Sequence, residues 1–320
     1  MRMIRAFLLA MAFGAMAAQA AETPTQASAQ APAQAMRAVL ITGASTGIGR
    51  NATEYLAARG WFVYAGARKA EDLEALGKIA NVQPLKLDVT QAADIAAAVE
   101  AVTKGGRGLY ALVNNAGIAT VGSTAETSDA EFDLLMKVNL YGPVQMTRAF
   151  LPLISAQKGR IVNIGSISGI LASPVLPAYS MSKHAIEAFT DSLATQLADQ
   201  GMQVSVVEPG NYNSEIGKSA VKRLASAGPD MPKGLAKADG DRSEFKEPTE
   251  VSVAIAAALT EPTPKRRYMV VPNEGEGART IRKQIEQLVQ LNEGQPYTYD
   301  RAALVKMLDE ALATARPQAH

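Results

Sequence analysis

Residues 39–49 read Val39-Leu-Ile-Thr42-Gly43-Ala-Ser-Thr-Gly47-Ile-Gly49, and they indicate the architecture of the chain. The first four residues suit a short buried strand, glycines follow at the spacing Gly-x-x-x-Gly-x-Gly, and residues 50–59 suit a helix. Glycines in such a turn let backbone N–H groups approach phosphate oxygens, and the N-terminus of the following helix adds a positive dipole. The segment therefore predicts a strand-turn-helix cradle for a pyrophosphate group.

The same turn admits a second interpretation. Gly43-Ala-Ser45-Thr-Gly47 also matches Gly-x-Ser-x-Gly, the nucleophile elbow of α/β hydrolases, which needs the same strand-turn-helix context. A hydrolase elbow normally follows several strands, and its triad needs a histidine after the acid. Here the turn follows the first predicted strand, and the chain has only His184 and His320. A hydrolase that uses Ser45 is therefore the weaker alternative.

A second pattern lies in Pro177-Ala-Tyr179-Ser-Met-Ser-Lys183, where apolar residues at later helical steps predict a helix with Tyr179 and Lys183 on one face. A phenol has a pKa of about 10, so acid-base chemistry near pH 7 requires lowering that pKa by about three units, or roughly 4 kcal/mol. An ammonium group about 4 Å away supplies about 4 kcal/mol at an effective dielectric of about 20. The pair predicts a tyrosine that exchanges protons, although neighbours on a solvated helix face are the simpler alternative for this spacing alone.

Five more motifs accompany the glycine turn and the Tyr-Lys pair. They are Asp88 in Leu87-Asp-Val-Thr90, Asn114-Asn-Ala-Gly117, Asn139 in Val138-Asn-Leu-Tyr-Gly142, Ser166 in Asn163-Ile-Gly-Ser-Ile-Ser-Gly169, and Pro209-Gly210. With these motifs in this order, the chain from about residue 39 to residue 210 resembles the short-chain dehydrogenase/reductase family. Its general appearance is most similar to the retinol and hydroxysteroid dehydrogenase branch of that family.

The resemblance implies an NAD(P)-dependent oxidoreductase that interconverts an alcohol and its ketone or aldehyde by hydride transfer. Tyr179 would be the general acid/base, Lys183 would lower the tyrosine pKa and bind the nicotinamide ribose, Ser166 would bond the carbonyl, and Asn139 would anchor the proton relay. The implied cofactor contacts are Gly43, Ser45, Thr46, Gly47, Ile48, Gly49, Arg68, Asp88, Val89, Asn115, Ala116, Gly117, Tyr179, Lys183, Pro209, Gly210 and Ser214. A non-catalytic NAD(P)-binding protein is the alternative from a different class.

The end of the second predicted strand bears on the choice of cofactor. In this fold an acidic residue at that point bonds the adenosine ribose, whereas an arginine pairs with a 2′-phosphate. Here the strand ends in Ala67, and Arg68 and Lys69 follow. Because a guanidinium group matches phosphate in a bidentate geometry, we expect NADP to be preferred, with NAD as the alternative.

The regular alternation of apolar runs and helical patterns predicts a single doubly wound Rossmann domain over residues 37–275, with a seven-stranded, mainly parallel sheet. We expect strands at Ala38–Thr42, Trp61–Ala65, Val82–Leu87, Leu109–Val113, Arg160–Ile164, Gln203–Val207 and Tyr268–Val271. Between them we expect helices, among them Asp129–Gln157, Pro177–Gln200 and Glu250–Leu259. The family's habit implies a homodimer or homotetramer through the first two of these helices.

The N-terminus carries a separate signal. Residues 1–20 have a basic start, an apolar run and small residues at Ala18-Gln-Ala20, which is typical of a secretory signal peptide, and residues 21–36 suit a disordered linker. The apolar run is too short for a membrane span. We therefore expect export to the periplasm or the medium; the alternative is a cytoplasmic protein that starts at Met36.

The region after Gly210 is expected to govern substrate choice. Residues 211–248 suit a mobile lid, and residues 276–320 suit a helical extension with helices at Thr280–Leu291 and Tyr299–Ala313. Apolar residues between Ser166 and Tyr179 favour a lipophilic small-molecule substrate: Ile170, Leu171, Val175 and Leu176. A net charge of +1 and the absence of a basic stripe give no sign of a nucleic-acid partner, and the sequence shows no metal-ligand motif.

Overall fold

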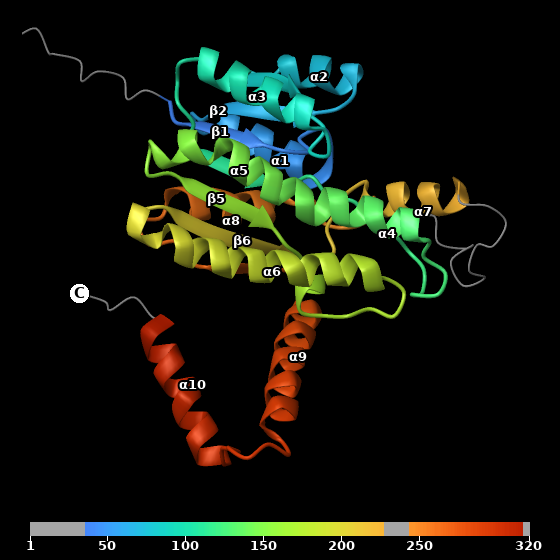
Figure 1. Ribbon diagram of the computed structural model, residues 1–320, viewed down its shortest axis with the longest axis vertical. Helices are drawn as coiled ribbons and strands as arrows, with labels where there is room; N and C mark the ends of the chain where they lie inside the picture. The colour runs from blue at the N-terminus through green and yellow to red at the C-terminus, as the bar shows by residue number, and fades with distance from the viewer. Residues whose placement is uncertain (1–35, 227–242, 316–320) are drawn as a thin grey trace, which may run out of the picture. The chain divides into compact units, whose positions relative to one another are not determined.

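The computed structural model describes residues 36–226 and 243–315, and within them seven strands form one sheet in the order β3-β2-β1-β4-β5-β6-β7 (Figure 1). Every neighbouring pair is parallel, so the predicted parallel sheet is confirmed. The strands are β1 (Ala38–Ile41), β2 (Phe62–Ala67), β3 (Val82–Lys86), β4 (Ala111–Asn114), β5 (Arg160–Ile164), β6 (Gln203–Pro209) and β7 (Arg267–Val270).

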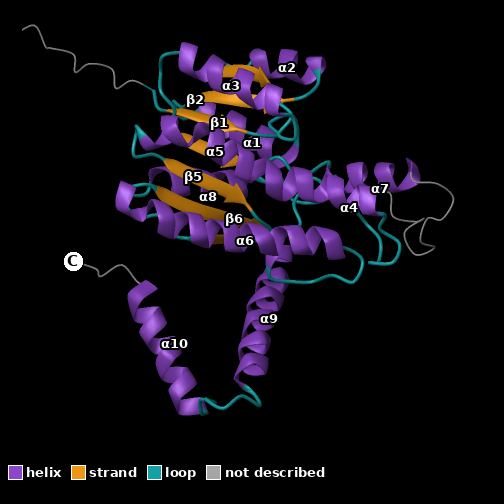
Figure 2. Cartoon of the chain, viewed as in Figure 1, coloured by secondary structure: helices purple, strands orange, loops and turns teal. Residues whose placement is uncertain are grey.

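Helices cover both faces of the sheet (Figure 2). One face carries α1 (Gly47–Ala57), α2 (Ala70–Gly77) and α8 (Thr249–Thr260), and the other carries α3 (Ala92–Lys104), α5 (Gly142–Ser155) and α6 (Pro177–Leu197). Because successive side chains of a strand point to opposite faces, Ile41 packs in one core with Leu56 and Ile255. Its neighbour Leu40 packs in the second core with Phe150. A sheet buried on both sides explains why these strands are apolar without alternation.

The strand order reverses between β1 and β4, which lie next to each other although β2 and β3 separate them in the sequence. In open α/β sheets, ligands bind outside the carboxyl ends of the strands at such a reversal. The glycine turn follows β1 at this point, and residues 115–117 follow β4. The topology therefore brings two of the predicted motifs together.

The helix expected over residues 129–157 is interrupted. The chain forms α4 (Asp129–Met136), then one π-helical turn, Lys137–Tyr141, and then α5. A π turn inside a helix is rare and is frequent at functional sites. This π turn contains Asn139, whose side chain forms hydrogen bonds with Ile118 and Ser182, outside the helix that contains it.

The C-terminal half of the described chain adds α7 (Ile216–Ser226), α9 (Glu274–Asn292) and α10 (Arg301–Ala315), and short 3₁₀ turns at Ile167–Gly169 and Ala198–Gln200. The helix α9 begins before the expected Thr280. The Asn273 side chain caps it: its Oδ1 accepts the Glu276 N–H at 3.0 Å, and its Nδ2 donates to Glu276 Oε1 at 3.2 Å. Asn292 and Tyr299 exchange two hydrogen bonds of 2.9 Å between α9 and α10.

Some expectations fall outside the described residues. They are the signal peptide at 1–20, the linker up to residue 35, and residues 227–242 of the expected lid. In the part of the chain that the structure covers, no helix combines the length and the apolar character that a bilayer crossing needs.

Candidate active site

The glycine turn adopts the backbone conformations that only glycine takes without strain. Gly43 and Gly47 have φ angles of +64° and +53°. At Gly49 the obstacle is space, because a Cβ atom there would overlap the Gly43 carbonyl oxygen and the Asn115 amide. The turn is therefore a backbone-lined concavity at the N-terminus of α1, which is the geometry that receives a phosphate group.

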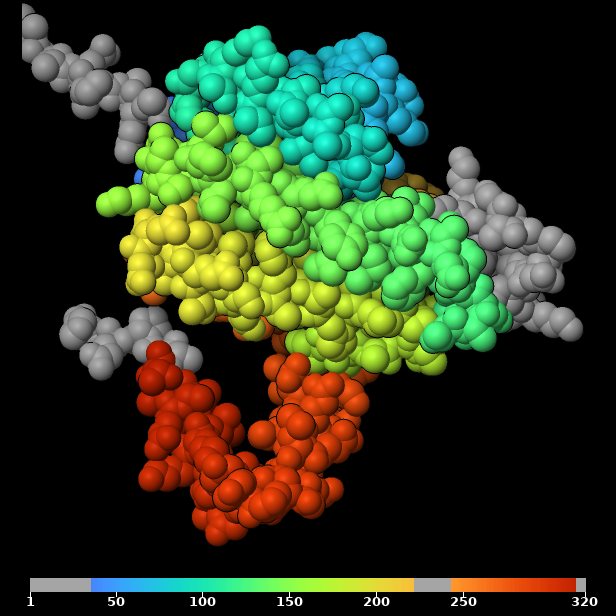
Figure 3. All heavy atoms as spheres, viewed as in Figure 1, coloured from blue at the N-terminus to red at the C-terminus, as the bar shows by residue number. Residues whose placement is uncertain are grey.

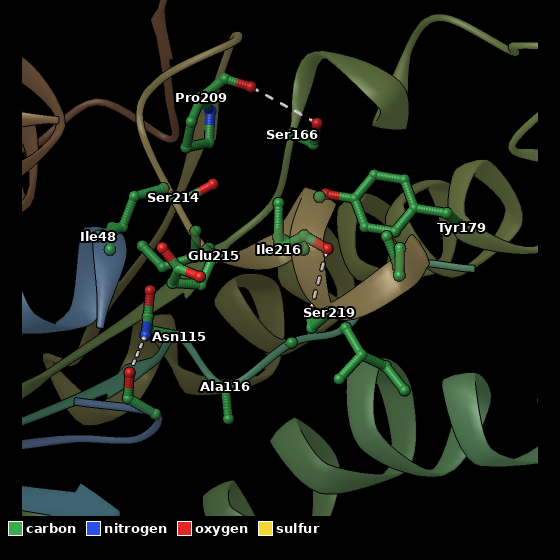
Figure 4. Close-up of a pocket in the computed structure, with 18 of the residues that line it drawn as sticks. Ile48, Asn115, Ala116, Ser166, Tyr179, Pro209, Ser214, Glu215, Ile216 and Ser219 are labelled. Carbon is green, nitrogen blue, oxygen red and sulfur yellow. Dashed lines mark hydrogen bonds between the residues drawn. The ribbon is translucent and has the colours of Figure 1, made fainter. Parts of the chain in front are cut away.

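The chain after β4 holds this turn in place. Thr42 Oγ1 accepts the backbone N–H groups of Asn115 and Ala116 at 3.0 and 2.9 Å. In return, the Asn115 side-chain amide (Figure 4) donates to the carbonyl oxygens of Thr42 at 2.8 Å and Gly43 at 3.0 Å. Four hydrogen bonds thus fix the glycine turn against the end of the neighbouring strand.

A ladder of buried polar side chains continues beneath the site. The Asn114 amide donates to Asn163 Oδ1 at 2.9 Å, and the Asn163 amide donates to Thr190 Oγ1 at 2.9 Å. These bonds link β4, β5 and α6 inside the core, where an unpaired amide would be costly. The ladder sets the position of α6 relative to β5, and these two elements carry the predicted catalytic residues.

One cavity of about 920 Å³ lies at the carboxyl ends of the strands, and Ser166, Tyr179 and Lys183 line it. It is also lined by all the residues predicted to contact a cofactor: Gly43, Ser45, Thr46, Gly47, Ile48, Gly49, Arg68, Asp88, Val89, Asn115, Ala116, Gly117, Tyr179, Lys183, Pro209, Gly210 and Ser214. Figure 4 shows Ser166, Tyr179 and Ser214 around this space. Apart from Asn139, the predicted site residues, which lie between residues 43 and 214, therefore converge on a single site.

Lys183 is a buried cation next to Tyr179. Its Nζ donates to the Ile164 carbonyl at 2.8 Å and lies 5.6 Å from the centre of the tyrosine ring. Burial lowers the pKa of Lys183 to about 8, and the Glu187 carboxylate one turn further along α6 opposes that shift. Lys183 is therefore mostly protonated at pH 7, and its charge is little screened by solvent.

Ser166 caps the short 3₁₀ turn after β5. Its Oγ accepts the Ser168 N–H at 3.1 Å, which orients the hydroxyl group. The hydroxyl proton points toward the Pro209 carbonyl at 3.5 Å, a distance at which a hydrogen bond is weak. This proton is consequently available to a better acceptor in the cavity.

Asn139 does not line the cavity, and its side chain is fully occupied. Oδ1 accepts the Ile118 N–H at 2.9 Å, while Nδ2 donates to the Ile118 carbonyl at 2.8 Å and to Ser182 Oγ at 3.1 Å. Ser182 Oγ in turn donates to the Tyr179 carbonyl at 2.7 Å. The side chain therefore ties the chain after β4 to the helical turn that carries the tyrosine.

The end of β2 has no carboxylate, as expected, and Ala67, Arg68 and Lys69 all line the cavity. Arg68 lies 3.7 Å from Asp88 and its side chain is 66% exposed, so this ion pair is loose. Burial tends to raise the pKa of Asp88, but hydrogen bonds from Thr90 and the Arg68 guanidinium together hold it below its ordinary value.

Four polar residues that were not predicted from the sequence lie at or beside the site. Glu187 and Glu208 form a buried pair of carboxyl groups behind Gly165, and Arg279 and Lys283 of α9 line the cavity. The spacing Asn273-x-x-Glu276, a sequence signature of a helix N-terminus, was the available signal for the position of α9. The carboxyl pair had no such signal, since its members are 21 positions apart on α6 and β6.

Two of the four residues that suggested a lipophilic substrate are at the site. Leu171 and Leu176 line the cavity, whereas Ile170 and Val175 do not. Val175 is 46% exposed at the surface. The apolar contribution of this loop to the cavity is therefore smaller than the sequence suggested.

Comparisons with known proteins agree with this geometry. The short chain dehydrogenase family profile matches residues 37–225. D-beta-hydroxybutyrate dehydrogenase from Mus musculus is 33% identical over 75% of this chain and 78% of its own length. Human 17-beta-hydroxysteroid dehydrogenase type 6 is 36% identical over 64% of this chain and 66% of its own length. A crystal structure of a variant actinorhodin polyketide ketoreductase with NADPH is 27% identical, has a TM-score of 0.64, and covers 76% of this chain and 97% of that one. The resemblance read from the motifs is confirmed: the chain belongs to the short-chain dehydrogenase family, on its hydroxysteroid dehydrogenase-like side.

Proposed function

We propose that this protein is an NADP-preferring oxidoreductase that interconverts an alcohol and its ketone or aldehyde, with Tyr179 as the general acid/base. The observation that carries the proposal is a single cavity lined by the glycine turn, Ser166, Tyr179 and Lys183. The names of two relatives, a hydroxybutyrate and a hydroxysteroid dehydrogenase, support a substrate with an oxidisable hydroxyl group.

The residues present fit a nicotinamide dinucleotide. The turn at Gly43, Gly47 and Gly49 has the backbone shape for a pyrophosphate, and a Cβ at Gly49 would collide with the Gly43 carbonyl and the Asn115 amide that hold that shape. We assign the adenine end to Asp88 and Val89, and the nicotinamide end to Pro209, Gly210 and Ser214, which line the cavity. When bound, the reduced nicotinamide supplies the hydride.

The side chains of this chain then perform the proton chemistry. Ser166 Oγ turns its loosely held proton from the Pro209 carbonyl to the substrate oxygen. Tyr179 gives its phenolic proton to that oxygen during reduction, or takes it during oxidation. The buried Lys183 ammonium favours the phenolate form by charge, and Asn139 with Ser182 fixes the helical turn that presents the tyrosine.

Cofactor preference rests on Arg68, which lines the cavity at the end of β2. We expect its guanidinium to leave its loose pair with Asp88 and to bind a 2′-phosphate. The test is a fluorescence titration of the wild type and Arg68→Ala with NADPH and NADH. Tighter binding of NADPH that is lost in the variant supports the assignment, and equal binding of the two cofactors by the wild type refutes it.

The Tyr179→Phe variant separates the proposal from the non-catalytic alternative. Loss of carbonyl reduction with NADPH binding retained means an enzyme, whereas a wild type that binds NADPH and reduces no carbonyl in a broad panel means a binding protein.

The alternative of a hydrolase that uses Ser45 gains no support from the position of the histidine. His184, the histidine within the described residues, lies on α6 and bonds the Ser180 carbonyl at 2.8 Å.

Two further proposals concern the whole protein. We propose a homodimer or homotetramer through the α4–α5 segment and α6, which lie side by side on one face (Figure 3).

We also propose export directed by residues 1–20, with a cytoplasmic start at Met36 as the alternative. N-terminal sequencing of the mature protein from separated cell fractions tests the second proposal, because cleavage after Ala20 and initiation at Met36 give different first residues.

A further inference from the structure

The helix α9 presents two cations to the candidate active site. Arg279 and Lys283 lie one turn apart and line the same cavity as Ser166 and Tyr179. Arg279 is exposed and Lys283 is half-buried. Over residues 36–226 and 243–315, neither forms an ion pair, and Glu215, an acidic residue that also lines the cavity, pairs with Lys218 at 3.2 Å.

The fold fixes which face of α9 turns toward the cavity. Glu276 is buried, and its Oε2 accepts the Asn211 N–H at 2.9 Å; Thr280, one turn later, is also buried. At about 100° per residue, Arg279 and Lys283 lie within about 60° of Glu276 around the helix axis. The anchored face thus directs both cations to the cavity side, and they are not on the exposed apolar face formed by Ile281 and Ile285.

These cations are at the substrate end of the cavity and not at the adenosine end. Asn211, which anchors α9, follows Pro209-Gly210, and the Pro209 carbonyl lies against the Ser166 hydroxyl. Arg68 follows β2, and α9 follows β7, five strand positions away in the sheet. At about 4.8 Å per strand, this separation is about 24 Å, so α9 cannot serve the phosphate that Arg68 would bind.

We propose that Arg279 and Lys283 bind the carboxylate of a hydroxy-acid or keto-acid substrate whose reacting carbon lies at Ser166 and Tyr179. The guanidinium group matches a carboxylate in bidentate geometry, and the ammonium group adds a second charge-assisted bond. Leu171 and Leu176 line the cavity and would contact the hydrocarbon part between the two polar ends. This inference rests on the proposed oxidoreductase function, because it assigns the substrate class of the same site.

The first test is steady-state oxidation by the full chain of 3-hydroxybutyrate, 3-hydroxyhexanoate and 3-hydroxyoctanoate, each compared with its uncharged methyl ester. The variants are Arg279→Gln and Lys283→Gln, and the matched control is Arg282→Gln, a cation on the same helix that does not line the cavity. We expect each cavity variant to lose at least about tenfold in kcat/KM for the acids, mainly through KM, and less than about twofold for the esters. The Arg282→Gln control should have the kcat/KM of the wild type for both the acids and the esters.

The second test measures binding without turnover. The same hydroxy acids are titrated by calorimetry into the protein saturated with NADPH. The complex that forms cannot react, because the cofactor and the hydroxy acid are both already reduced. Binding by the wild type and the Arg282→Gln control, with an affinity at least about tenfold weaker in Arg279→Gln and Lys283→Gln, supports the inference. Failure of the wild type to bind any of these acids, or equal binding by all variants, overturns it.

The two tests also separate this inference from the proposed function. Turnover of the esters with no preference for the acids overturns the carboxylate site and leaves an alcohol dehydrogenase. Binding of the acids that depends on Arg279 and Lys283, with no turnover of any alcohol, supports the carboxylate site and overturns the oxidoreductase proposal.

Discussion

At the scale of single residues, Lys183 is the group whose ionisation most directly affects the proposed reaction. Its pKa of about 8, lowered by burial, means that the ammonium group loses its proton as the pH rises through 8. The proposed role requires the charged form, because only a cation favours the phenolate of Tyr179. We therefore expect kcat/KM for carbonyl reduction to fall above a pH of about 8.

The Lys183→Arg variant provides the control for this pH profile. Arginine stays protonated throughout the measured pH range, so the decline near pH 8 should disappear even though the imperfect fit lowers the rate by about tenfold or more. The measurement is kcat/KM between pH 6 and 10 for both proteins. A flat profile in the wild type, or the same decline near pH 8 in Lys183→Arg, contradicts the assignment.

The buried carboxyl pair Glu187 and Glu208 makes a prediction about stability. Within the described residues, one oxygen of each side chain meets no hydrogen-bond donor, and the Arg267 guanidinium lies 3.2 Å from Glu187 and 3.6 Å from Glu208. Burial and then the neighbouring Glu187 charge raise the pKa of Glu208 to about 8. A single proton held between the two carboxyl groups accounts for both observations.

The sign of the pH dependence follows from this raised pKa. Between pH 4.5 and 8 the folded chain keeps a proton that the unfolded chain releases, so the free energy of unfolding falls as the pH rises. Glu208→Gln mimics the protonated form and should be more stable than the wild type by about 1–3 kcal/mol at pH 8.5, with a smaller gain at pH 5. Asp191→Asn, which alters an exposed partner of Arg267, should change stability by less than about 1 kcal/mol.

Urea unfolding of the wild type and both variants at pH 5 and pH 8.5 checks this expectation. A gain for Glu208→Gln that does not change between the two pH values contradicts the shared proton. A large loss of stability at both values means instead that the carboxylate of Glu208 is needed for its contact with Arg267.

At the scale of elements, the glycine turn yields a prediction with a matched control. In Gly49→Ala the new Cβ overlaps the Gly43 carbonyl and the Asn115 amide, so the turn must open. We expect NADPH affinity to fall by at least about tenfold and stability to fall by about 2 kcal/mol or more. The matched control is Gly275→Ala in the first turn of α9, where the new Cβ would make an ordinary contact of 3.4 Å with Asn273 Oδ1. This variant should leave cofactor binding unchanged. Retained affinity in Gly49→Ala contradicts the assigned cradle.

Most elements could be predicted because local pattern and tertiary burial agree. The strand at Arg160–Ile164 has the expected bounds, and the other six strands are displaced by no more than two residues at either end. A parallel sheet covered on both faces produces uninterrupted apolar runs, and the glycine spacing marks the turn after the first one. The residues of the site could be predicted for the same reason, since every motif except that of Asn139 follows a strand or lies at the start of a helix.

The features that could not be predicted depend on contacts between distant segments. In the π turn at Lys137–Tyr141, Asn139 bonds Ile118 and Ser182, which are 21 and 43 positions away. The cations of α9 reach the cavity because Glu276 is anchored to Asn211, 65 positions earlier. Periodicity indicates that such helices exist, but it does not show which of their polar residues will face a ligand.

At the scale of the whole molecule, the α4–α5 segment and α6 form the surface that we expect to join subunits. Leu134, Tyr141 and Met181 are 39%, 56% and 54% exposed there. Burying a tyrosine of this size in an interface contributes a few kcal/mol, and a buried charge reverses that gain. We therefore expect Tyr141→Glu to shift a dimer or tetramer toward monomer, as measured by light scattering after size exclusion.

The matched control for the interface is Ile285→Glu, because Ile285 on α9 is equally exposed at 56%. It should leave the mass of the wild-type particle unchanged. A monomeric wild type contradicts the oligomer, and dissociation by Ile285→Glu but not by Tyr141→Glu places the interface on α9 and not on α6.

The central claim is that this cavity transfers a hydride and that Tyr179 exchanges the accompanying proton. The most direct measurement is mass spectrometry of the alcohol products formed from a panel of ketones and keto acids with NADPH deuterated at the transferred position of C4. We predict an alcohol that carries one deuterium on the former carbonyl carbon with the wild type, and no such product with Tyr179→Phe although that variant still binds NADPH. Labelled product at the wild-type rate from Tyr179→Phe would contradict the role of the tyrosine, and no label from the wild type on any substrate would contradict the oxidoreductase itself.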